Sequence, residues 1–270
     1  MSKNFENDIE TPVNDTEMSD TVRLPVGLEV DGVRYRSVVI DEMTGIDDHN
    51  IAGKKAGNNG AKGITVLLSR CVQEVEGYLD RKANPEKMLD RSFARRLTVI
   101  DRDFLLTQIY MYSGDNSVVL AGQCPRCGIP WEEDGRLSDL EVVEWPEDKP
   151  LEIEFELPRG YLKDGKTHKK GSLRFPTGKE QELIGEMQNP AQIFDALFAS
   201  CLLRLGDLEH FDQEMMKRMK SADRRYLMNY LQSAFPGVRQ WKAVRCKCGR
   251  EFEIHADLTS FFDGGRRTVS

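Results

Sequence analysis

The chain contains an internal repeat, and this repeat restricts its fold more than any other feature of the sequence. LPVGLEVDGVRYRSVVIDEMTG, from Leu24 to Gly45, aligns without a gap on LPRGYLKDGKTHKKGSLRFPTG, from Leu157 to Gly178. Leu-Pro, the first Gly, Asp-Gly and Thr-Gly match at the same positions of the two stretches. An extended segment that turns at Asp-Gly and returns is typical of a β-hairpin. We therefore expect one hairpin at each place, followed by helical sequence after Thr-Gly.

Helical patterns follow both predicted hairpins in the same order. Apolar residues recur at helical spacing in 64–76 and again in 193–205. Further along, DRDFLLTQIYMY at 101–112 is similar to DRRYLMNYLQSAF at 223–235. The charged stretch 80–100 predicts a helical connector within the first copy. Chance is a poor explanation for so many matches in one order.

These matches predict an α+β protein made of two tandem copies of one unit. Each unit would contain a β-hairpin, several helices and a cysteine-bearing zinc-knuckle hairpin, and one zinc site would join the two units. The predicted organisation is an acidic, disordered tail at 1–20, a first unit at 21–144, a linker at 145–150, a second unit at 151–262 and a C-terminal tail at 263–270. The linker contains two prolines and two acids among its six residues, a composition that rarely forms a regular element.

Two cysteine motifs lie at equivalent places near the ends of the two units. CPRCG holds Cys124 and Cys127, and CKCG holds Cys246 and Cys248. The glycine behind each second cysteine can adopt the positive φ that turns backbone N–H groups toward the sulfurs of a zinc knuckle. Structural zinc binds four thiolate or imidazole ligands in a tetrahedron. We predict that the four cysteines bind one structural Zn²⁺ at a pseudo-twofold axis between the units; the sequence does not separate zinc from iron.

Two other interpretations of these cysteines remain, unlinked thiols and a redox-active pair. A redox C-x-x-C stands at a helix N-terminus, whereas GIPWEEDG, after Cys127, predicts a strand and a turn. The one-residue spacing of C-x-C is the weakest point of the zinc prediction. His255 is a possible substitute ligand, but four cysteines already complete the tetrahedron, so we expect it on the hairpin surface. Cys71 and Cys201 lie on apolar helices and are expected in the core.

Charge and hydropathy exclude several classes of function. The net charge is -7, and residues 1–20 hold six acids and one base, which leaves the rest of the chain nearly neutral. A neutral body lacks the basic field on which non-specific nucleic-acid binding relies. The sequence has no apolar run of the ~20 residues that a membrane helix needs and no secretory signal at its start. We expect a cytoplasmic protein without membrane or nucleic-acid partners.

Catalysis finds little support in the sequence. The Gly-rich loop GKKAGNNGAKG lacks the G-K-[ST] ending of a P-loop. A zinc ion with four thiolate ligands has no open position for water and is structural. We expect no enzymatic activity and no small-molecule substrate. The basic patch KDGKTHKKGSLR at 163–174 has two open interpretations, a solvated hairpin or a contact with an acidic partner surface.

Two parts of the chain resemble a known family. DRDFLLTQIYMYSGD followed by CPRCG, and LPRGY…GSLRFPTGKEQELI followed by a Leu-rich helix and CKCG, are similar to the zinc-containing baseplate proteins of contractile-tailed bacteriophages and related contractile injection systems. Members are described as baseplate hub assembly proteins or tail assembly chaperones. The resemblance covers most of 24–258 and carries over the four cysteines of the two motifs, although the C-x-C departs from equal spacing.

The resemblance implies a non-enzymatic part that helps to build or hold the baseplate. Its partners would be hub or wedge subunits, and its location would be the host cytoplasm during assembly or the virion tail. A different class stays open, a zinc-ribbon regulator that binds nucleic acid, and an enzyme ranks third. The regulator would need a basic face and salt-dependent DNA binding.

Overall fold

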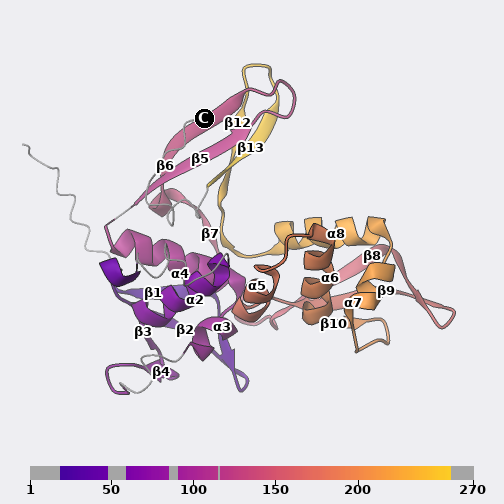
Figure 1. Ribbon diagram of the computed structural model, residues 1–270, viewed down its shortest axis with the longest axis horizontal. Coiled ribbons are helices and arrows are strands. Elements are labelled where there is room, and N and C mark those ends of the chain that lie inside the picture. The colour runs from indigo at the N-terminus through magenta and orange to yellow at the C-terminus, as the bar shows by residue number, and fades with distance from the viewer. Residues whose placement is uncertain (1–18, 48–58, 85–90, 115, 257–270) are drawn as a thin grey trace, which may run out of the picture.

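The computed structural model describes residues 19–47, 59–84, 91–114 and 116–256, and the fold is given for these residues (Figure 1). Of the predicted tail 1–20 only the last two residues are described. The predicted tail 263–270 lies outside the described residues, as does the end of the second predicted unit after residue 256. Within the described ranges, no helix combines the length and the apolar composition that crossing a membrane requires.

The molecule mixes helices and strands in two bodies that lie side by side, and a β-arm projects from them (Figure 1). The first part of the chain forms β1 (Thr21–Val30), β2 (Val33–Ile40), α2 (Gly60–Cys71), β3 (Val72–Val75), β4 (Leu79–Asp80), α3 (Ser92–Arg96), α4 (Val99–Tyr112), β5 (Ser117–Gln123), β6 (Pro130–Arg136), the 3-10 helix η3 (Leu137–Asp139) and β7 (Val142–Val143). The second part forms β8 (Glu152–Lys163), β9 (Lys166–Arg174), α5 (Gly178–Ile184), α6 (Pro190–Cys201), β10 (Leu202–Leu205), α7 (Gln213–Arg218), α8 (Ser221–Ala234), β11 (Gly237–Val238), β12 (Trp241–Arg245) and β13 (Glu251–Ala256).

Both predicted hairpins are confirmed. β1 pairs with β2 and β8 pairs with β9, in each case antiparallel. The turns lie at the Asp-Gly dipeptides, where Asp31 and Gly32 have φ of 51° and 77°, and Asp164 and Gly165 have φ of 50° and 77°. Two successive residues with positive φ form the tight turn that matches the twist of the two strands. The strand orders are β1-β2-β3-β4 in one sheet and β10-β9-β8 in the other.

A β-bulge interrupts the first strand of each hairpin at the Leu-Pro-x-Gly sequence. The register shifts between Arg23 and Leu28 in β1, and between Glu156 and Tyr161 in β8. The glycine of each bulge has a positive φ, 101° at Gly27 and 79° in the second bulge. A side chain at that position would be strained, and this explains why the same glycine stands in both stretches.

A buried aspartate in the first turn of a long helix accepts hydrogen bonds from each bulge. Asp101 of α4 is fully buried and accepts from the N–H groups of Val26 (2.8 Å) and Gly27 (3.1 Å). Asp223 of α8 is also fully buried and accepts from the N–H of Arg159 at 2.7 Å. Its second oxygen, Oδ2, has no hydrogen-bond partner among the described residues. The two aspartates therefore perform one task with unequal numbers of hydrogen bonds.

The predicted helices at 64–76 and 193–205 are correct only up to their cysteines. α2 ends at Cys71 and α6 ends at Cys201, and the chain then continues directly as β3 and β10. These strands add to the free edges of β2 and β9. Apolar spacing in a short buried run does not distinguish a helix from a strand, and edge pairing decided the outcome. The long helices predicted around 101–112 and 223–235 are confirmed as α4 and α8.

The predicted helical connector at 80–100 is helical in only part of its described residues. Asp80 ends strand β4, a turn follows, and helix returns only in α3 and at the start of α4. High charge is typical of a solvated helix, but here the short helix α3 buries Phe93 and Ala94 and does not extend into one continuous connector. The residues 85–90 lie outside the described part of the chain.

Two hydrophobic cores lie beneath the two hairpins, and each contains residues from the other half of the chain. Ile254 and Ala256 of β13 belong to the core of the first half. Val26 and Ile100, from the first half, belong to the core of the second. Because a separate domain has its own core, the two halves are interlocked.

The two core cysteines are placed as expected. Cys71 and Cys201 are 1% and 3% exposed, and each lies within a hydrophobic cluster. Burial raises the pKa of both thiols to about 12. A thiol with so high a pKa stays protonated and behaves as a small apolar side chain.

The linker at 145–150 lies on the first hairpin. The N–H of Trp145 donates to the carbonyl of Pro25 at 2.8 Å, and its ring packs edge-on against Phe175 at 5.1 Å between centroids. Arg36 is 7% exposed and donates to the Glu144 carboxylate at 3.1 Å. The linker is therefore part of the structure that connects the two cores.

The two bulge aspartates give a matched test of their hydrogen bonds. We expect Asp101→Asn to lower the free energy of unfolding by about 1–3 kcal/mol, because a buried N–H group loses its acceptor. Asp223→Asn should cost clearly less, since its Oδ2 has no partner to lose. Urea denaturation followed by circular dichroism measures both, and an equal loss in the two variants would contradict this account of the bulges.

Thr177 and Glu180 form a capping box at the start of α5, and this capping box predicts that the stability of the fold depends on pH. Although burial opposes ionisation of Glu180, hydrogen bonds from Arg174 and Thr177 lower its pKa to about 2, from an ordinary 4.5. The stability that the carboxylate provides is present above about pH 4.5 and is lost as the pH falls toward 2. Glu180→Gln should therefore lose about 1–3 kcal/mol at pH 7, and the difference from the wild type should shrink between pH 4.5 and pH 3. Urea denaturation at pH 7, 5 and 3 checks this; a constant difference would be the contrary result.

Candidate metal centre

The projecting arm is a four-stranded sheet built from both halves of the chain. Its strand order is β12-β13-β5-β6 (Figure 1). β5 pairs with β6 along its whole length, and β12 with β13 likewise. The two hairpins join where His255 and Ala256 of β13 pair with Ala121 and Leu120 of β5. A strict twofold would pair equivalent strands, such as β5 with β12, so the predicted pseudo-twofold does not extend to the hydrogen bonds of this sheet.

Close packing brings the two hairpins together along the arm. A Cβ atom on Gly122 would lie 3.1 Å from a methyl group of Ile254, so a larger residue there would push β13 away from β5 by a few tenths of an ångström. The aromatic residues that follow the two motifs, Trp131 and Phe252, meet edge-on at 6.1 Å between ring centroids. The repeated Cys-Gly-x-x-aromatic pattern was the only signal of this contact in the sequence. These contacts place the two cysteine turns at the end of the arm away from the helices (Figure 1).

The first cysteine turn connects β5 to β6. The N–H of Gly128 donates to the carbonyl of Cys124 at 2.9 Å, and the N–H of Cys124 donates to the carbonyl of Ile129 at 3.0 Å. Gly128 has a φ of 70°, as its place behind Cys127 predicted. Positive φ at this residue lets the chain reverse tightly enough to place both sulfurs on the same side of the turn.

The second cysteine turn connects β12 to β13 and closes in the same way with one residue fewer. The N–H of Gly249 donates to the carbonyl of Cys246 at 2.8 Å, and the N–H of Cys246 donates to the carbonyl of Arg250 at 2.8 Å. Gly249 has a φ of 84°. The short spacing between Cys246 and Cys248 is therefore accommodated by a shorter turn that still exposes both sulfurs to the other hairpin.

The four predicted cysteines lie in one cluster. Their Sγ atoms all lie within 4.8 Å of one another. Across the two hairpins, Cys124 and Cys248 are 3.7 Å apart, and Cys127 and Cys246 are 3.5 Å apart. A zinc ion with Zn–S bonds of about 2.3 Å sets tetrahedral S–S edges of about 3.8 Å. A disulfide needs about 2.05 Å, so the distances match a shared ion and exclude bonded pairs.

The cluster is partly shielded from solvent, and hydrogen bonds among its thiols lower the pKa of Cys124 while they raise the pKa of Cys127 to about 12. Cys124 and Cys246 are buried, while Cys127 is exposed. Burial disfavours the charged form of Cys124, but hydrogen bonds from the N–H groups of Cys127 and Arg126 and from the thiols of Cys127 and Cys248 lower its pKa to about 6. The thiolate is the form that binds a metal. Arg126 also donates to the carbonyl of Cys248 at 3.2 Å, a second link between the turns.

The alternatives for these cysteines can be compared with the geometry. The segment after Cys127 is strand β6, as predicted, and not the helix that a redox C-x-x-C requires. His255 lies in β13 with its side chain 60% exposed and outside the sulfur cluster. Within the described ranges, the four cysteines form the one group of three or more Cys, His, Asp or Glu side chains that is arranged to hold a metal ion.

A set of four sulfurs can hold an ion but leaves it no free coordination position. Structural zinc sites are closed tetrahedra of this kind, whereas catalytic sites keep one position for water or substrate. Comparison with known proteins adds no assignment, because no family model, curated protein or solved structure matches the chain. The chemistry of the cluster therefore rests on its own geometry.

Metal content tests the cluster directly. We expect purified protein to contain one metal ion per chain, because the four sulfurs converge on one centre. Cys246→Ser should reduce this to near zero, since three sulfurs and one hydroxyl bind a soft ion far more weakly than four thiolates. Elemental analysis by mass spectrometry gives the stoichiometry and the identity of the metal. Cys201→Ala is the matched control and should keep the ion, because Cys201 lies in the core; its loss there, or a metal-free wild type, would contradict the assignment.

Proposed function

We propose that the protein is a non-enzymatic structural or assembly component of a contractile phage tail baseplate, stabilised by a structural Zn²⁺. The observation that carries this proposal is the closed cluster of four cysteines at the end of an arm made by both halves of the chain. A closed thiolate site provides folding energy and no reactive position. This is what a protein that acts through its shape requires.

We further propose that the chain is a tandem duplication with units at 21–144 and 151–262. The two hairpins turn at equivalent Asp-Gly pairs and carry bulges at equivalent positions. Asp101 and Asp223 accept hydrogen bonds from equivalent bulges. β3 and β10 both join the second strand of their hairpin after a helix that ends in cysteine. Agreement at so many separate points supports descent from one unit.

Four cysteine ligands at this spacing can bind either zinc or iron. We propose zinc for the following reason. Zn²⁺ has no redox chemistry, so it holds the two hairpins together whatever the potential of the compartment. Binding of the ion thus contributes to the stability of the arm and of the contacts between the halves.

The arm also offers surface for contacts with other proteins. Ile129, beside the first cysteine turn, is 51% exposed, and Trp241 of β12 is 42% exposed. Apolar side chains exposed on a projecting element often mark interaction sites. Baseplate hub or wedge proteins are the partners implied by the family resemblance, and the host cytoplasm or the virion tail is the implied location.

The alternative function, a zinc-ribbon regulator that binds nucleic acid, receives less support. Its DNA-binding face would need an excess of cations. The exposed residues on the strands of the arm include Glu132 and Asp134 of β6 and Glu251 and Glu253 of β13. The arm also exposes cations, among them Arg245, Lys247 and Arg250, so charges of both signs are mixed along it and the excess of cations is small.

Copurification and DNA binding together test the proposed function. Tagged protein incubated with a lysate that contains contractile tail particles should retain tail proteins, and Cys246→Ser should retain fewer, because its arm loses the ion. Cys201→Ala should behave like the wild type. A mobility-shift assay at low salt should show no DNA complex. A salt-dependent DNA complex without retained tail proteins would replace the proposal with the regulator.

A further inference from the structure

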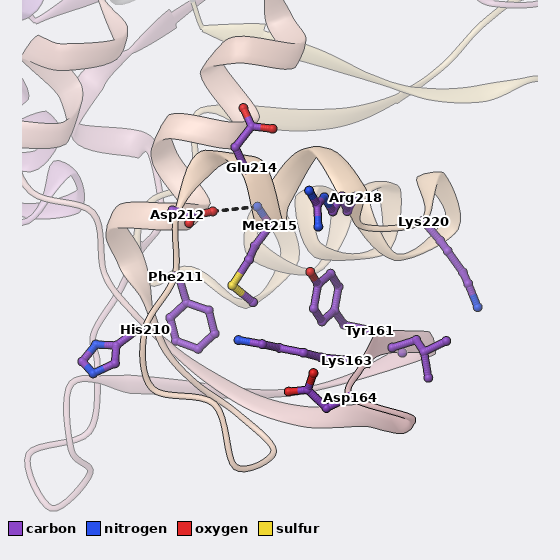
Figure 2. A pocket seen from close by; sticks show the side chains of 12 residues that line it. Tyr161, Lys163, Asp164, His210, Phe211, Asp212, Glu214, Met215, Arg218 and Lys220 are labelled. Atoms are coloured by element: carbon purple, nitrogen blue, oxygen red, sulfur yellow. Dashed lines mark hydrogen bonds between the residues drawn. The ribbon is translucent and has the colours of Figure 1, made fainter.

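A pocket of about 740 Å³ lies beside the tip of the β8–β9 hairpin, far from the cysteine cluster. One wall is formed by 160–164 at the end of β8, and the other by 210–220, which includes α7. Figure 2 shows side chains from both walls converging on the space between them. Its volume falls within the range of about 300–1,000 Å³ that is typical of binding sites. The basic patch predicted at 163–174 begins at the edge of this pocket.

Cations without ion-pair partners line the pocket. Lys163, Arg218 and Lys220 are exposed, and within the described part of the chain none of the three forms a salt bridge. Lys163 also stands directly opposite Lys166 across the hairpin. Like charges in cross-strand pairs are destabilising, and at this tip Lys166 forms an ion pair with Asp207 while Lys163 forms none among the described residues.

Most of the acidic side chains around the pocket have other roles. Asp212 caps α7, with its carboxylate accepting from the N–H of Met215 at 2.8 Å (Figure 2). Glu214 forms an ion pair with Lys217 at 2.6 Å, and in Figure 2 its carboxylate points away from the pocket. Asp164, in the hairpin turn, lies beside the Lys163 side chain (Figure 2). The lining holds as many acids as Lys and Arg side chains, but two of its three acids are engaged in a helix cap or an ion pair, whereas its Lys and Arg side chains form no salt bridge among the described residues.

An apolar wall completes the pocket. The rings of Tyr161 and Phe211 and the thioether of Met215 face the space into which Lys163 extends (Figure 2). Tyr161 is 8% exposed and belongs to the core of the second half, so this wall is rigid. Leu162, at the rim, is 64% exposed. A ligand that satisfies both the cations and this wall carries negative charge together with an aromatic or large apolar group.

The same chain already holds a segment of this chemistry elsewhere. In the linker, EWPED, the Glu144 carboxylate accepts from Arg36, the Trp145 ring packs on Phe175, and Arg34 donates to the carbonyl of Pro146 at 3.2 Å. Cationic side chains and an aromatic wall thus bind an acidic stretch that contains a tryptophan. The pocket at the β8–β9 tip has the same two components but no occupant of this kind among the described residues.

We propose that this pocket binds an acidic segment of a partner protein through its carboxylates and one aromatic side chain. The proposal rests on the proposed function insofar as the partner is a protein of the assembly. Lys163, Arg218 and Lys220 would bind the carboxylates, and the ring would enter between Phe211 and Met215. A nucleic-acid strand also has negative charge and aromatic bases, and the test below separates the two.

Fluorescence anisotropy with four labelled probes tests the pocket on the full-length, metal-loaded protein. The probes are a ten-residue acidic peptide with one central Trp, the same peptide with Ala in place of Trp, a basic peptide with one central Trp, and a ten-nucleotide single strand of DNA. We expect the acidic Trp peptide to bind at least about tenfold more tightly than the other three, because only it satisfies both the cations and the apolar wall. Its affinity should fall as salt is added.

Charge reversal locates the binding. Lys163→Glu combined with Arg218→Glu should weaken binding of the acidic Trp peptide at least about tenfold, whereas Lys82→Glu combined with Lys179→Glu, two exposed cations outside the pocket, should leave it unchanged. Circular dichroism and thermal melting are the controls that check whether both double variants fold. The proposal is overturned if the acidic Trp peptide does not bind, if the Ala peptide binds equally well, if DNA binds more tightly, or if the pocket variant binds like the wild type.

These outcomes are separable from those of the proposed function. Tail proteins retained by the tagged wild type, combined with failure of the peptide test, would overturn the pocket alone. In the opposite case, the wild type binds the acidic Trp peptide, the pocket variant does not, and no tail proteins are retained. This result would support the binding site for an acidic segment and overturn the baseplate assignment.

Discussion

The convergence of four sulfurs from two distant hairpins is the constraint on which the architecture depends. Cys124 and Cys248 lie on different hairpins, yet their sulfurs are 3.7 Å apart at the end of the arm. The same hairpins are anchored at the other end, where Ile254 and Ala256 of β13 enter the core of the first half. The arm is thus fixed at both ends, and relative movement of the two halves would have to disturb a sulfur cluster, a strand pairing and a core together.

Exchange of residues between the halves explains why the molecule is not two independent domains on a linker. Val26, in the bulge of β1, packs in the second core while its N–H donates to Asp101 of the first half. Trp145 packs edge-on against Phe175 and donates to the carbonyl of Pro25. Each of these contacts lies where the two bodies meet. A half of the chain with contacts of this kind would not fold alone, because part of each core is supplied by the other half.

The two candidate sites lie in different parts of the molecule and have different chemistry. The cysteine cluster is closed and suited to holding structure, whereas the pocket beside α7 is cationic, partly aromatic and open to a ligand. In the proposed function, the cysteine cluster would stabilise the fold and the pocket would bind a partner. The asymmetry between the halves supports this division, because the first hairpin carries the chain's own acidic linker, whereas no such segment covers the tip of the second among the residues that the structure describes.

The sequence by itself determined the hairpins, the long helices and the identity of the four clustered cysteines. These features depend on local chemistry, such as the positive φ that Asp-Gly allows and the regular apolar spacing of α4 and α8. Only the tertiary structure decided that the chain after Cys71 and Cys201 becomes a strand, because the free edge of the neighbouring hairpin supplied the hydrogen bonds. It also decided the pairing of β13 with β5 and the cationic pocket, since both arise from side chains and strand edges far apart in sequence, whose meeting no local pattern encodes.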